Sequence, residues 1–234
     1  MAKKASTPAP VPQQPAIKVF IVDDHPIIRQ GLAQLIRQEP DMVYCGDAED
    51  ASDALKAIEQ CQPDIALVDI SLKTSNGIEL IKDLRIRQPN LAILVLSMHD
   101  ESFYAERVLR AGARGYVMKE EATERVVQAI RQILAGKIYL SEKMSASMLS
   151  KLVEGRSAAT SFPIDRLSDR ELEVFELIGR GLGTRQIASK LHLSVKTIES
   201  HRANLKVKLQ ISSATELLRH AINWVQSEKP TQKA

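Results

Sequence analysis

Short runs of apolar, often β-branched residues alternate with amphipathic stretches over residues 17–136. The runs are short enough for strands and predict them at residues 17–22, 42–45, 65–68, 91–96 and 116–117. The stretches between them have helical periodicity; in the first, Ile28, Leu32 and Ile36 recur every four positions and share one face. Helices are therefore predicted at residues 26–38, 51–60, 78–88, 103–111 and 123–134.

The strict alternation of strand and helix predicts the fold class of this region. Parallel strands need crossover connections, and right-handed crossovers place helices on both faces of the sheet. We therefore expect a doubly wound α/β domain with a five-stranded parallel sheet over residues 17–136.

The strand signal ends after Gly136, and the rest of the chain has a helical pattern. Residues 137–164 are predicted as a helical linker followed by a flexible joint, and residues 165–228 as a small all-α domain of four helices. Two helix starts in that domain match a capping box, one from Ser168 to Glu171 and one from Ser213 to Glu216. Residues 1–16, rich in Pro, Ala and Gln, and residues 229–234 are predicted to be tails.

Composition agrees with a folded protein, since 44% of the residues are hydrophobic and 26% are charged. No apolar run reaches the roughly 18 residues that a membrane-spanning helix needs, and the N-terminus lacks the apolar segment of a secretory signal. A cytoplasmic protein is expected. Cys45 and Cys61 lie 16 positions apart without zinc-binding spacing, so reduced structural thiols are predicted.

The two predicted domains carry opposite net charge. Residues 17–136 have 14 Lys and Arg against 19 Asp and Glu, a net charge of −5. Residues 165–234 have 12 against 8, a net charge of +4. This asymmetry indicates that the first part handles cations or phosphate groups and that the second meets an anionic polymer.

Chemically active side chains follow the predicted strands at the edge where binding sites of such sheets lie. Asp23 and Asp24 follow the first strand and Asp69 the third, while Ser97 ends the fourth and Lys119 follows the fifth. Three clustered carboxylates repel one another without a cation, and Mg²⁺ accepts oxygen ligands of this kind. Asp69 is therefore a candidate nucleophile for a phosphoryl group, with Asp23 and Asp24 as metal ligands.

Each of these residues alone is more often a solvated surface residue than a functional one. Their joint placement at successive strand ends favours a functional site. Over residues 17 to about 136, the sequence resembles the receiver domain of bacterial two-component response regulators. The matching residues are Val22-Asp23-Asp24-His25-Pro26, Asp69 with Gly77 eight positions later, Leu96-Ser97, and Gly115-Tyr116-Val117-Met118-Lys119.

The resemblance implies roles for these residues. A sensor histidine kinase would phosphorylate Asp69, Mg²⁺ would be bound by Asp23, Asp24, Asp69 and the Ser71 carbonyl, Ser97 and Lys119 would bind the phosphoryl group, and Tyr116 would be a rotamer switch. One position departs from the family pattern, because Leu72-Lys73 stands where receivers usually have Met-Pro. Without proline's fixed φ the loop is expected to be looser, and Lys73 adds a cation near the site.

The basic domain contains two predicted helices separated by a tight turn, which is the arrangement of a helix-turn-helix. The first covers residues 184–191, and the second begins after Ser194 and ends near Leu209. On a helical wheel, Ile198, Leu205 and Leu209 share the core side. The opposite side has small residues, which suits close approach to a DNA groove. It is surrounded by cations that are expected to neutralise phosphates: Lys190, Lys196, Arg202, Lys206 and Lys208.

This domain also resembles the LuxR-type DNA-binding domain of NarL/FixJ-type regulators. The resemblance rests on Leu167-Ser168-Asp169-Arg170-Glu171-Leu172-Glu173-Val174, Gln186-Ile187-Ala188, and Ser194-Val195-Lys196-Thr197-Ile198-Glu199-Ser200-His201-Arg202. It implies binding of double-stranded promoter DNA at paired half-sites and a homodimer formed through the last helix when the protein is phosphorylated. The expected DNA contacts are Lys196, Thr197, Glu199, Ser200, His201, Arg202, Ala203 and Lys206, and the expected dimer surface is Leu218, Ile222 and Val225.

Two alternatives remain at this point. An aspartyl phosphatase would need an Asp-x-Asp pattern after the first strand, which Asp23-Asp24 does not provide, so an enzyme is not predicted. A protein-binding adaptor would retain the basic domain without binding DNA. Loss of binding to duplex DNA with added salt separates a DNA-binding regulator from that adaptor.

Overall fold

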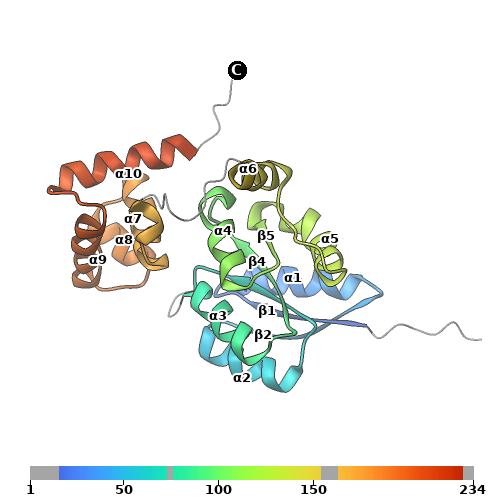
Figure 1. Ribbon diagram of the computed structural model, residues 1–234. Helices are drawn as coiled ribbons and strands as arrows, with labels where there is room; N and C mark the ends of the chain where they lie inside the picture. Colours follow the sequence, from blue (N-terminus) through green and yellow to red (C-terminus); the bar gives the residue numbers. More distant parts are fainter. Residues whose placement is uncertain (1–15, 73–75, 154–162, 229–234) are drawn as a thin grey trace, which may run out of the picture.

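The computed structural model describes residues 16–72, 76–153 and 163–228. Apart from residues 16 and 163, the predicted tails and the flexible joint at 155–163 lie outside the described residues, as does Lys73. The α/β part and the helical C-terminal part are both visible in Figure 1.

The first part is a five-stranded parallel sheet, and the predicted fold class is confirmed. The strand order is β2-β1-β3-β4-β5, so the order reverses between β1 and β3 and opens a crevice at their carboxyl ends. The strands are β1 (Ile17–Val22), β2 (Met42–Ala48), β3 (Ile65–Asp69), β4 (Ala92–Ser97) and β5 (Gly115–Met118).

Helices cover both faces of the sheet. On one face α1 (Pro26–Gln38) and α5 (Ala122–Leu134) bury Ile36 and Ile130 against the strands. On the other face lie α2 (Ala51–Cys61), α3 (Gly77–Arg87) and α4 (Glu101–Ala111). The short 3₁₀ helix η1 (Lys119–Glu121) joins β5 to α5.

Strand β2 extends three residues beyond the predicted end at Cys45. The apolar pattern ends at Cys45 because Gly46 and Asp47 follow. The strand continues through them because β2 is an edge strand of the sheet, where a polar side chain such as that of Asp47 can face solvent. The pairing with β1 shifts register between Val19 and Phe20. Gly46 packs so closely on the Phe20 ring that a Cβ would lie 2.9 Å from a ring carbon.

The two cysteines lie side by side, and the prediction of separate reduced thiols is wrong for this structure. Cys45 on β2 and Cys61 at the end of α2 form a disulfide, with Cα atoms 6.3 Å apart. Their separation of 16 residues gave no signal in the sequence, because the pairing depends on how α2 packs back on β2.

The described residues of the C-terminal part form helices joined by short loops. After α6 (Glu142–Val153) and the 3₁₀ helix η3 (Pro163–Arg166), four helices follow: α7 (Asp169–Gly179), α8 (Thr184–Lys190), α9 (Val195–Lys208) and α10 (Ala214–Glu228). The predicted capping box at Ser168 and Glu171 is present at the start of α7. The one predicted at Ser213 forms only in part: Ser213 Oγ accepts from Glu216 N, but the Glu216 carboxylate accepts from Ser212 instead.

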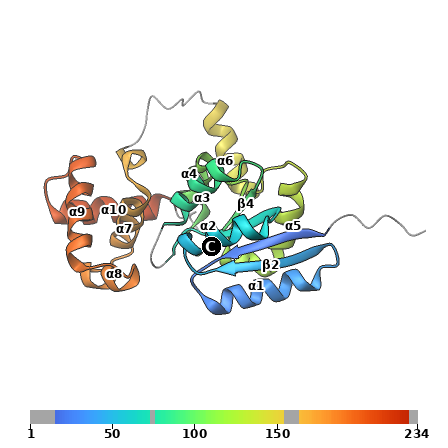
Figure 2. The same cartoon turned by 90° about the horizontal axis from the view of Figure 1, so that it is seen from below.

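The two parts are in contact through η3, α7 and α10. Figures 1 and 2 show α7 lying between the other C-terminal helices and α4. Phe103 on α4 stacks on Trp224 on α10, with ring centroids 4.3 Å apart. Arg107 on α4 donates to the carbonyls of Ile164 and Leu167 at 2.9 and 2.8 Å. The hydrophobic core thus continues from one part into the other.

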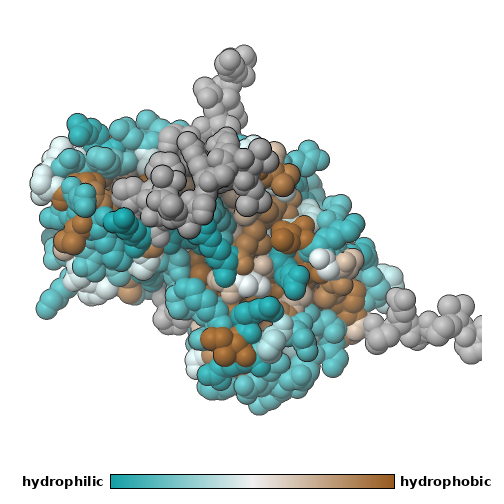
Figure 3. Space-filling model, viewed as in Figure 1, coloured by the Kyte–Doolittle hydropathy of each residue, from teal (hydrophilic) through white to brown (hydrophobic). Residues whose placement is uncertain are grey.

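Hydrophilic side chains occupy much of the face seen in Figure 3, with hydrophobic patches between them. Within the described residues, no helix combines the length and apolar character needed to cross a membrane.

Candidate functional site

The three predicted acidic residues meet in the crevice between β1 and β3. Asp23, Asp24 and Asp69 are all buried, and each offers a carboxylate oxygen within 4.8 Å of the others. His25, to which the sequence analysis gave no metal-binding role, belongs to the same cluster. Its backbone N–H donates to Asp23 Oδ1 at 2.9 Å, and its Nδ1 lies 2.6 Å from Asp24 Oδ1. A cluster of buried oxygen ligands of this kind fits a divalent cation.

Lys119 is the cation that faces this cluster from the end of β5. Its Nζ lies 2.6 Å from Asp69 Oδ2 and 2.6 Å from Asp23 Oδ2. Burial alone would lower the pKa of Lys119, but the charges of Asp69 and Asp23 outweigh it and raise that pKa. One ammonium against three carboxylates leaves an excess of negative charge in the crevice, which a metal ion would neutralise.

The position of Asp69 is fixed by the loop that follows β3. Ser71 N donates to Asp69 Oδ1 at 3.0 Å, and Gly77 N donates to the Ile70 carbonyl at 3.0 Å. A Cβ at Gly77 would lie 2.1 Å from the Asp69 carbonyl oxygen, so only glycine fits there. Burial raises the pKa of Asp69, and the Asp23 charge adds to this despite the opposing effect of Lys119. Binding of a cation would relieve that cost.

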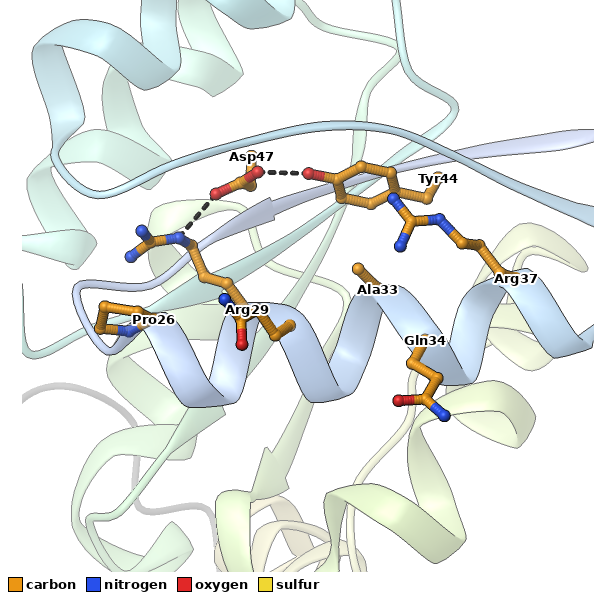
Figure 4. A pocket seen from close by; sticks show the side chains of 8 residues that line it. Pro26, Arg29, Ala33, Gln34, Arg37, Tyr44 and Asp47 are labelled. Carbon is orange, nitrogen blue, oxygen red and sulfur yellow. Dashed lines mark hydrogen bonds and ion pairs between the residues drawn. The ribbon is translucent and has the colours of Figure 1, made fainter.

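Arg29 supports the acidic cluster from α1. Its Nη1 donates to the Asp23 carbonyl at 2.6 Å, and its Nε donates to Asp47 Oδ2 at 2.6 Å. Asp47 also accepts from the Tyr44 hydroxyl, so β1, β2 and α1 are tied together at this point (Figure 4). Neither Arg29 nor Asp47 was predicted, because an arginine in an amphipathic helix has the pattern of a solvated residue.

Ser97 and Tyr116 lie next to the cluster and share His99 as a partner. Ser97 is fully buried and its Oγ accepts from His99 N at 3.1 Å. The Tyr116 hydroxyl donates to the His99 carbonyl at 2.9 Å, and burial raises the pKa of Tyr116. Ser97, one of the two predicted phosphoryl-binding residues, and Tyr116, the predicted switch residue, therefore meet at one backbone segment. Leu72, at the departure from the family pattern, is buried in the core.

The C-terminal part contains a helix-turn-helix formed by α8 and α9. Ser194 caps α9 by accepting from Thr197 N at 3.0 Å, as predicted, and Ile198 and Leu205 are fully buried. We call α9 the recognition helix, because it follows the turn of the motif. Its outer face carries four predicted contact residues, all of them exposed: Lys196, Glu199, Ser200 and Ala203.

The other predicted contact residues lie at the sides of the recognition helix. Arg202 and Lys206 are half-buried, and the Thr197 hydroxyl is hydrogen bonded to Ser194 Oγ at 2.7 Å. Burial lowers the pKa of His201, and the nearby Arg170 charge lowers it further. Lys208, also expected to neutralise phosphate, instead lies 2.6 Å from Glu171 Oε2 in an ion pair within the domain.

The predicted dimer surface on α10 is only partly accessible. Leu218 is exposed and Ile222 is half-buried. Val225 is buried against Gly179 of α7 and belongs to the core of the domain.

Family models match both parts of the chain. Residues 19–131 match the response regulator receiver domain, and residues 165–221 match the bacterial regulatory proteins of the luxR family. The curated relatives include the oxygen regulatory protein NreC of Staphylococcus carnosus, which is 36% identical over 211 residues that cover 88% of this chain and 97% of NreC. The same protein of Staphylococcus aureus strain MRSA252 is 34% identical over 210 residues, with the same coverage of 88% and 97%.

Solved structures are also similar to this chain. RcsB from Salmonella enterica serovar Typhimurium, bound to promoter rprA in the presence of the phosphomimetic BeF3⁻, is 28% identical with a TM-score of 0.57, covering 88% of this chain and 98% of RcsB. A LuxR-family two-component response regulator from Aurantimonas sp. SI85-9A1 is 34% identical with a TM-score of 0.55, covering 59% and 99%. The chain therefore belongs to the two-component response regulators of the NarL type, transcription regulators in which a receiver domain precedes a LuxR-type DNA-binding domain.

Proposed function

We propose that Asp69 accepts a phosphoryl group from a sensor histidine kinase and that this modification controls dimerisation and promoter binding. The domain limits we propose are 17–136 for the receiver and 165–228 for the DNA-binding domain. The observation that carries the proposal is the buried cluster of Asp23, Asp24 and Asp69 in contact with Lys119. A buried carboxylate next to a fixed ammonium is suited to attack a phosphoryl group.

The residues of this chain have distinct roles in the transfer. A carboxylate oxygen of Asp69 attacks the donor's phosphorus, and the bond to the donor breaks. Asp23, Asp24, Asp69 and the Ser71 carbonyl would hold Mg²⁺, which would supply positive charge next to the transferring oxygens. Lys119 and the Ser97 hydroxyl bind those oxygens from the other side. Because the Lys119 ammonium contacts both Asp69 and Asp23, it is already in position to bind the negative charge of the phosphoryl group on Asp69.

A groove beside the acidic cluster suits docking of the kinase. It lies between α1 and the start of α5, has a volume of about 320 Å³, and extends from Ile27 to Lys119. Ile27, which lines this groove, is 82% exposed and offers an apolar contact to a partner. An amphipathic helix of the kinase would bury Ile27 while presenting its phosphohistidine to Asp69.

Promoter binding is assigned to the outer face of the recognition helix. Small side chains at Ser200 and Ala203 allow close approach to base edges, and Lys196, Arg202 and Lys206 face the phosphates. The solved RcsB complexes, one of them on promoter DNA with a phosphomimetic, support the same use of this domain here. We propose a homodimer on paired half-sites through Leu218 and Ile222, without Val225. We also propose that the protein works in the cytoplasm, because bacterial promoters are bound there.

Incubation with a small phosphodonor and Mg²⁺ tests the assignment of Asp69. Intact mass is expected to increase by one phosphoryl group in the wild-type protein and in Asp83→Asn, an exposed aspartate on α3 that serves as the control. Asp69→Asn is expected to remain unmodified, and removal of Mg²⁺ with a chelator to slow the wild-type reaction. Modification of Asp69→Asn at the wild-type rate would refute the proposal.

A further inference from the structure

A strip of side chains along the outer face of the recognition helix contains one carboxylate and otherwise small or apolar groups. Beyond the first turn the strip consists of Glu199, Ser200, Ala203 and Val207, all of them exposed. On a helix with 3.6 residues per turn, these four positions lie within about 100° of one another, on the side opposite the core residues. In Figures 1 and 2, α9 lies at the edge of the C-terminal part, away from the sheet. The strip is therefore open to a partner.

Val207 gives the strip its largest apolar surface. It is 78% exposed, whereas Ile198 and Leu205 of the same helix are fully buried. A single exposed apolar residue is common on a protein surface, and here its position is informative. Val207 follows Ala203 by one turn and continues the face proposed to enter the major groove. The apolar group that a major groove offers to such a side chain is the C5-methyl group of thymine.

Glu199 is the single acidic residue among the 14 residues of the recognition helix. Phosphates repel a carboxylate on a DNA-facing side, so Glu199 opposes binding unless a base supplies a donor. In the major groove the cytosine N4 amino group is such a donor, while guanine presents two acceptors and thymine presents an acceptor and a methyl group. Glu199 therefore favours cytosine and disfavours guanine and thymine at the position that it faces.

The strip lacks the side chains that usually read purines. Arginine and lysine read guanine, and asparagine and glutamine read adenine. Lys196 lies in the first turn and is assigned to phosphate, and Asn204 lies about 100° around the helix from Ala203. The Ser200 hydroxyl donates to the Lys196 carbonyl at 3.1 Å, so its proton is used within the helix. Base reading is therefore left to one carboxylate and to methyl groups.

We propose that this strip reads cytosine and thymine: Glu199 accepts a hydrogen bond from a cytosine amino group, and Ala203 and Val207 pack on thymine methyl groups. The reading rests on the proposed use of the outer face for promoter binding. Four residues of helix rise about 6 Å, which is about two base-pair steps of roughly 3.4 Å. The half-site therefore contains a C·G pair, a T·A pair about two steps away for Ala203, and another about three to four steps away for Val207.

Selection from a random duplex library tests the reading in full-length protein with a small phosphodonor and Mg²⁺. Wild type should enrich half-sites with the C·G and T·A pairs at this spacing. Glu199→Gln should replace the cytosine preference by an adenine preference, because glutamine pairs with adenine N6 and N7. Val207→Ala should keep the cytosine and lose the distal thymine. Retention of the wild-type preferences in both variants would overturn the reading.

Removal of one methyl group from the DNA tests the Val207 contact directly. In the best selected duplex, the thymine assigned to Val207 is replaced by uracil, which lacks the C5-methyl group. Wild type should bind the uracil duplex about fourfold more weakly, the value of one buried methyl group. Val207→Ala should bind the two duplexes almost equally, because the contact is already lost. An equal loss in both proteins would show that Val207 does not contact that methyl group.

Two matched controls change exposed residues outside the strip. Glu59→Gln alters an exposed glutamate on α2, and Ile86→Ala alters an apolar residue on α3 whose exposed fraction of 78% equals that of Val207. Both should select the wild-type sequence with wild-type affinity. Since Glu199 and Val207 are themselves exposed, their substitution leaves the core intact, and circular dichroism checks the fold of each variant.

Lys196→Ala separates this reading from the proposed use of the outer face. It should lower affinity for all duplexes by a similar factor, because phosphate contacts carry no sequence information. If it does so while Glu199→Gln and Val207→Ala select the wild-type sequence, the outer face binds DNA and the base reading is wrong. If none of the three variants changes affinity or sequence, the outer face does not bind DNA and both proposals fail. If wild type enriches the expected sequence equally well without phosphodonor, the reading stands and control by Asp69 fails.

Discussion

The ammonium of Lys119 lies 2.6 Å from a carboxylate oxygen of Asp69. The proposed nucleophile and the cation that would stabilise the transferring charge are thus in contact before any phosphoryl group arrives. Removal of that cation by Lys119→Gln is expected to slow phosphorylation by a small phosphodonor about a hundredfold, the usual effect of losing one transition-state charge partner. The rate is measured by intact mass against time, with the exposed Lys56→Gln as the control. Equal rates in wild type and Lys119→Gln would assign Lys119 a structural role only.

Asp69 is expected to lower the stability of the metal-free protein, because burial raises its pKa. A carboxyl group with a raised pKa favours the folded state at acidic pH and loses that contribution as the pH rises through the folded-state pKa. Asp69→Asn should therefore melt at a higher temperature than wild type in chelator, with a gap that widens from acidic to neutral pH. Mg²⁺ should reduce the difference in melting temperature between Asp69→Asn and wild type, because it neutralises the carboxylates. An Asp69→Asn variant less stable than wild type at neutral pH would be inconsistent with this account.

The close approach of Gly77 to Asp69 makes a specific prediction about side-chain space. In Gly77→Ala the new Cβ would lie 2.1 Å from the Asp69 carbonyl oxygen, so the acceptor loop must shift. We expect a loss of about 1–3 kcal/mol in the free energy of unfolding and slower phosphorylation. Gly31→Ala is the control: nothing lies within 4 Å of its Cβ, and alanine in this helix should stabilise the protein by about 1 kcal/mol. Denaturant unfolding measures the free energy of unfolding of both variants. Equal changes in the two would contradict the close packing of Gly77 against the acceptor loop.

Two lysines of the recognition helix are expected to differ in DNA binding. Lys196 is exposed on the outer face, so Lys196→Ala should reduce the slope of log affinity against log salt by about 0.9. Lys208 is paired with Glu171, so Lys208→Ala should leave that slope nearly unchanged and instead lower the stability of the DNA-binding domain. Titration of a promoter duplex at several salt concentrations gives both slopes. A larger change for Lys208 than for Lys196 would mean that the helix faces DNA differently.

The Cys45–Cys61 pair is expected to make stability depend on redox conditions. A bridge between Cα atoms 6.3 Å apart closes a loop of roughly 15 residues, for which chain entropy predicts a stabilisation of about 3 kcal/mol. Wild type should therefore lose that amount on reduction, while Cys45→Ser should be insensitive to reductant. Denaturant unfolding with and without a thiol reductant measures the difference. Identical unfolding of wild type under both conditions would show that the bridge does not form in solution.

Local patterns predicted most of the fold and the centre of the site. The strand and helix periods of the sequence located the sheet and its helices. Because the carboxyl ends of parallel strands lie at one edge of the sheet, the sequence also predicted that Asp23 and Asp69 lie close together. The start of the recognition helix after Ser194 could also be predicted from a local pattern, because a cap residue and its helix are adjacent in sequence.

Contacts between distant segments were not predictable in the same way. Arg29, His99 and Glu176 each lie in stretches whose patterns are those of ordinary loops or helix faces, and their partners are far along the chain. Lys208 was predicted to contact DNA phosphate. A helical wheel cannot show that Glu171, on a neighbouring helix, lies close enough to pair with it. Val225 was placed on the dimer surface because α10 is apolar on two sides, and packing against Gly179 decides which side is internal.

The central claim is that charge on Asp69 controls DNA binding, and one titration tests it most directly. Affinity for a promoter duplex is measured at fixed salt for wild type and Asp69→Asn, each with and without a small phosphodonor and Mg²⁺. The account predicts that phosphodonor raises the affinity of wild type and leaves that of Asp69→Asn unchanged. An equal gain in both proteins, or no gain in a wild type whose mass shows full phosphorylation, would contradict it.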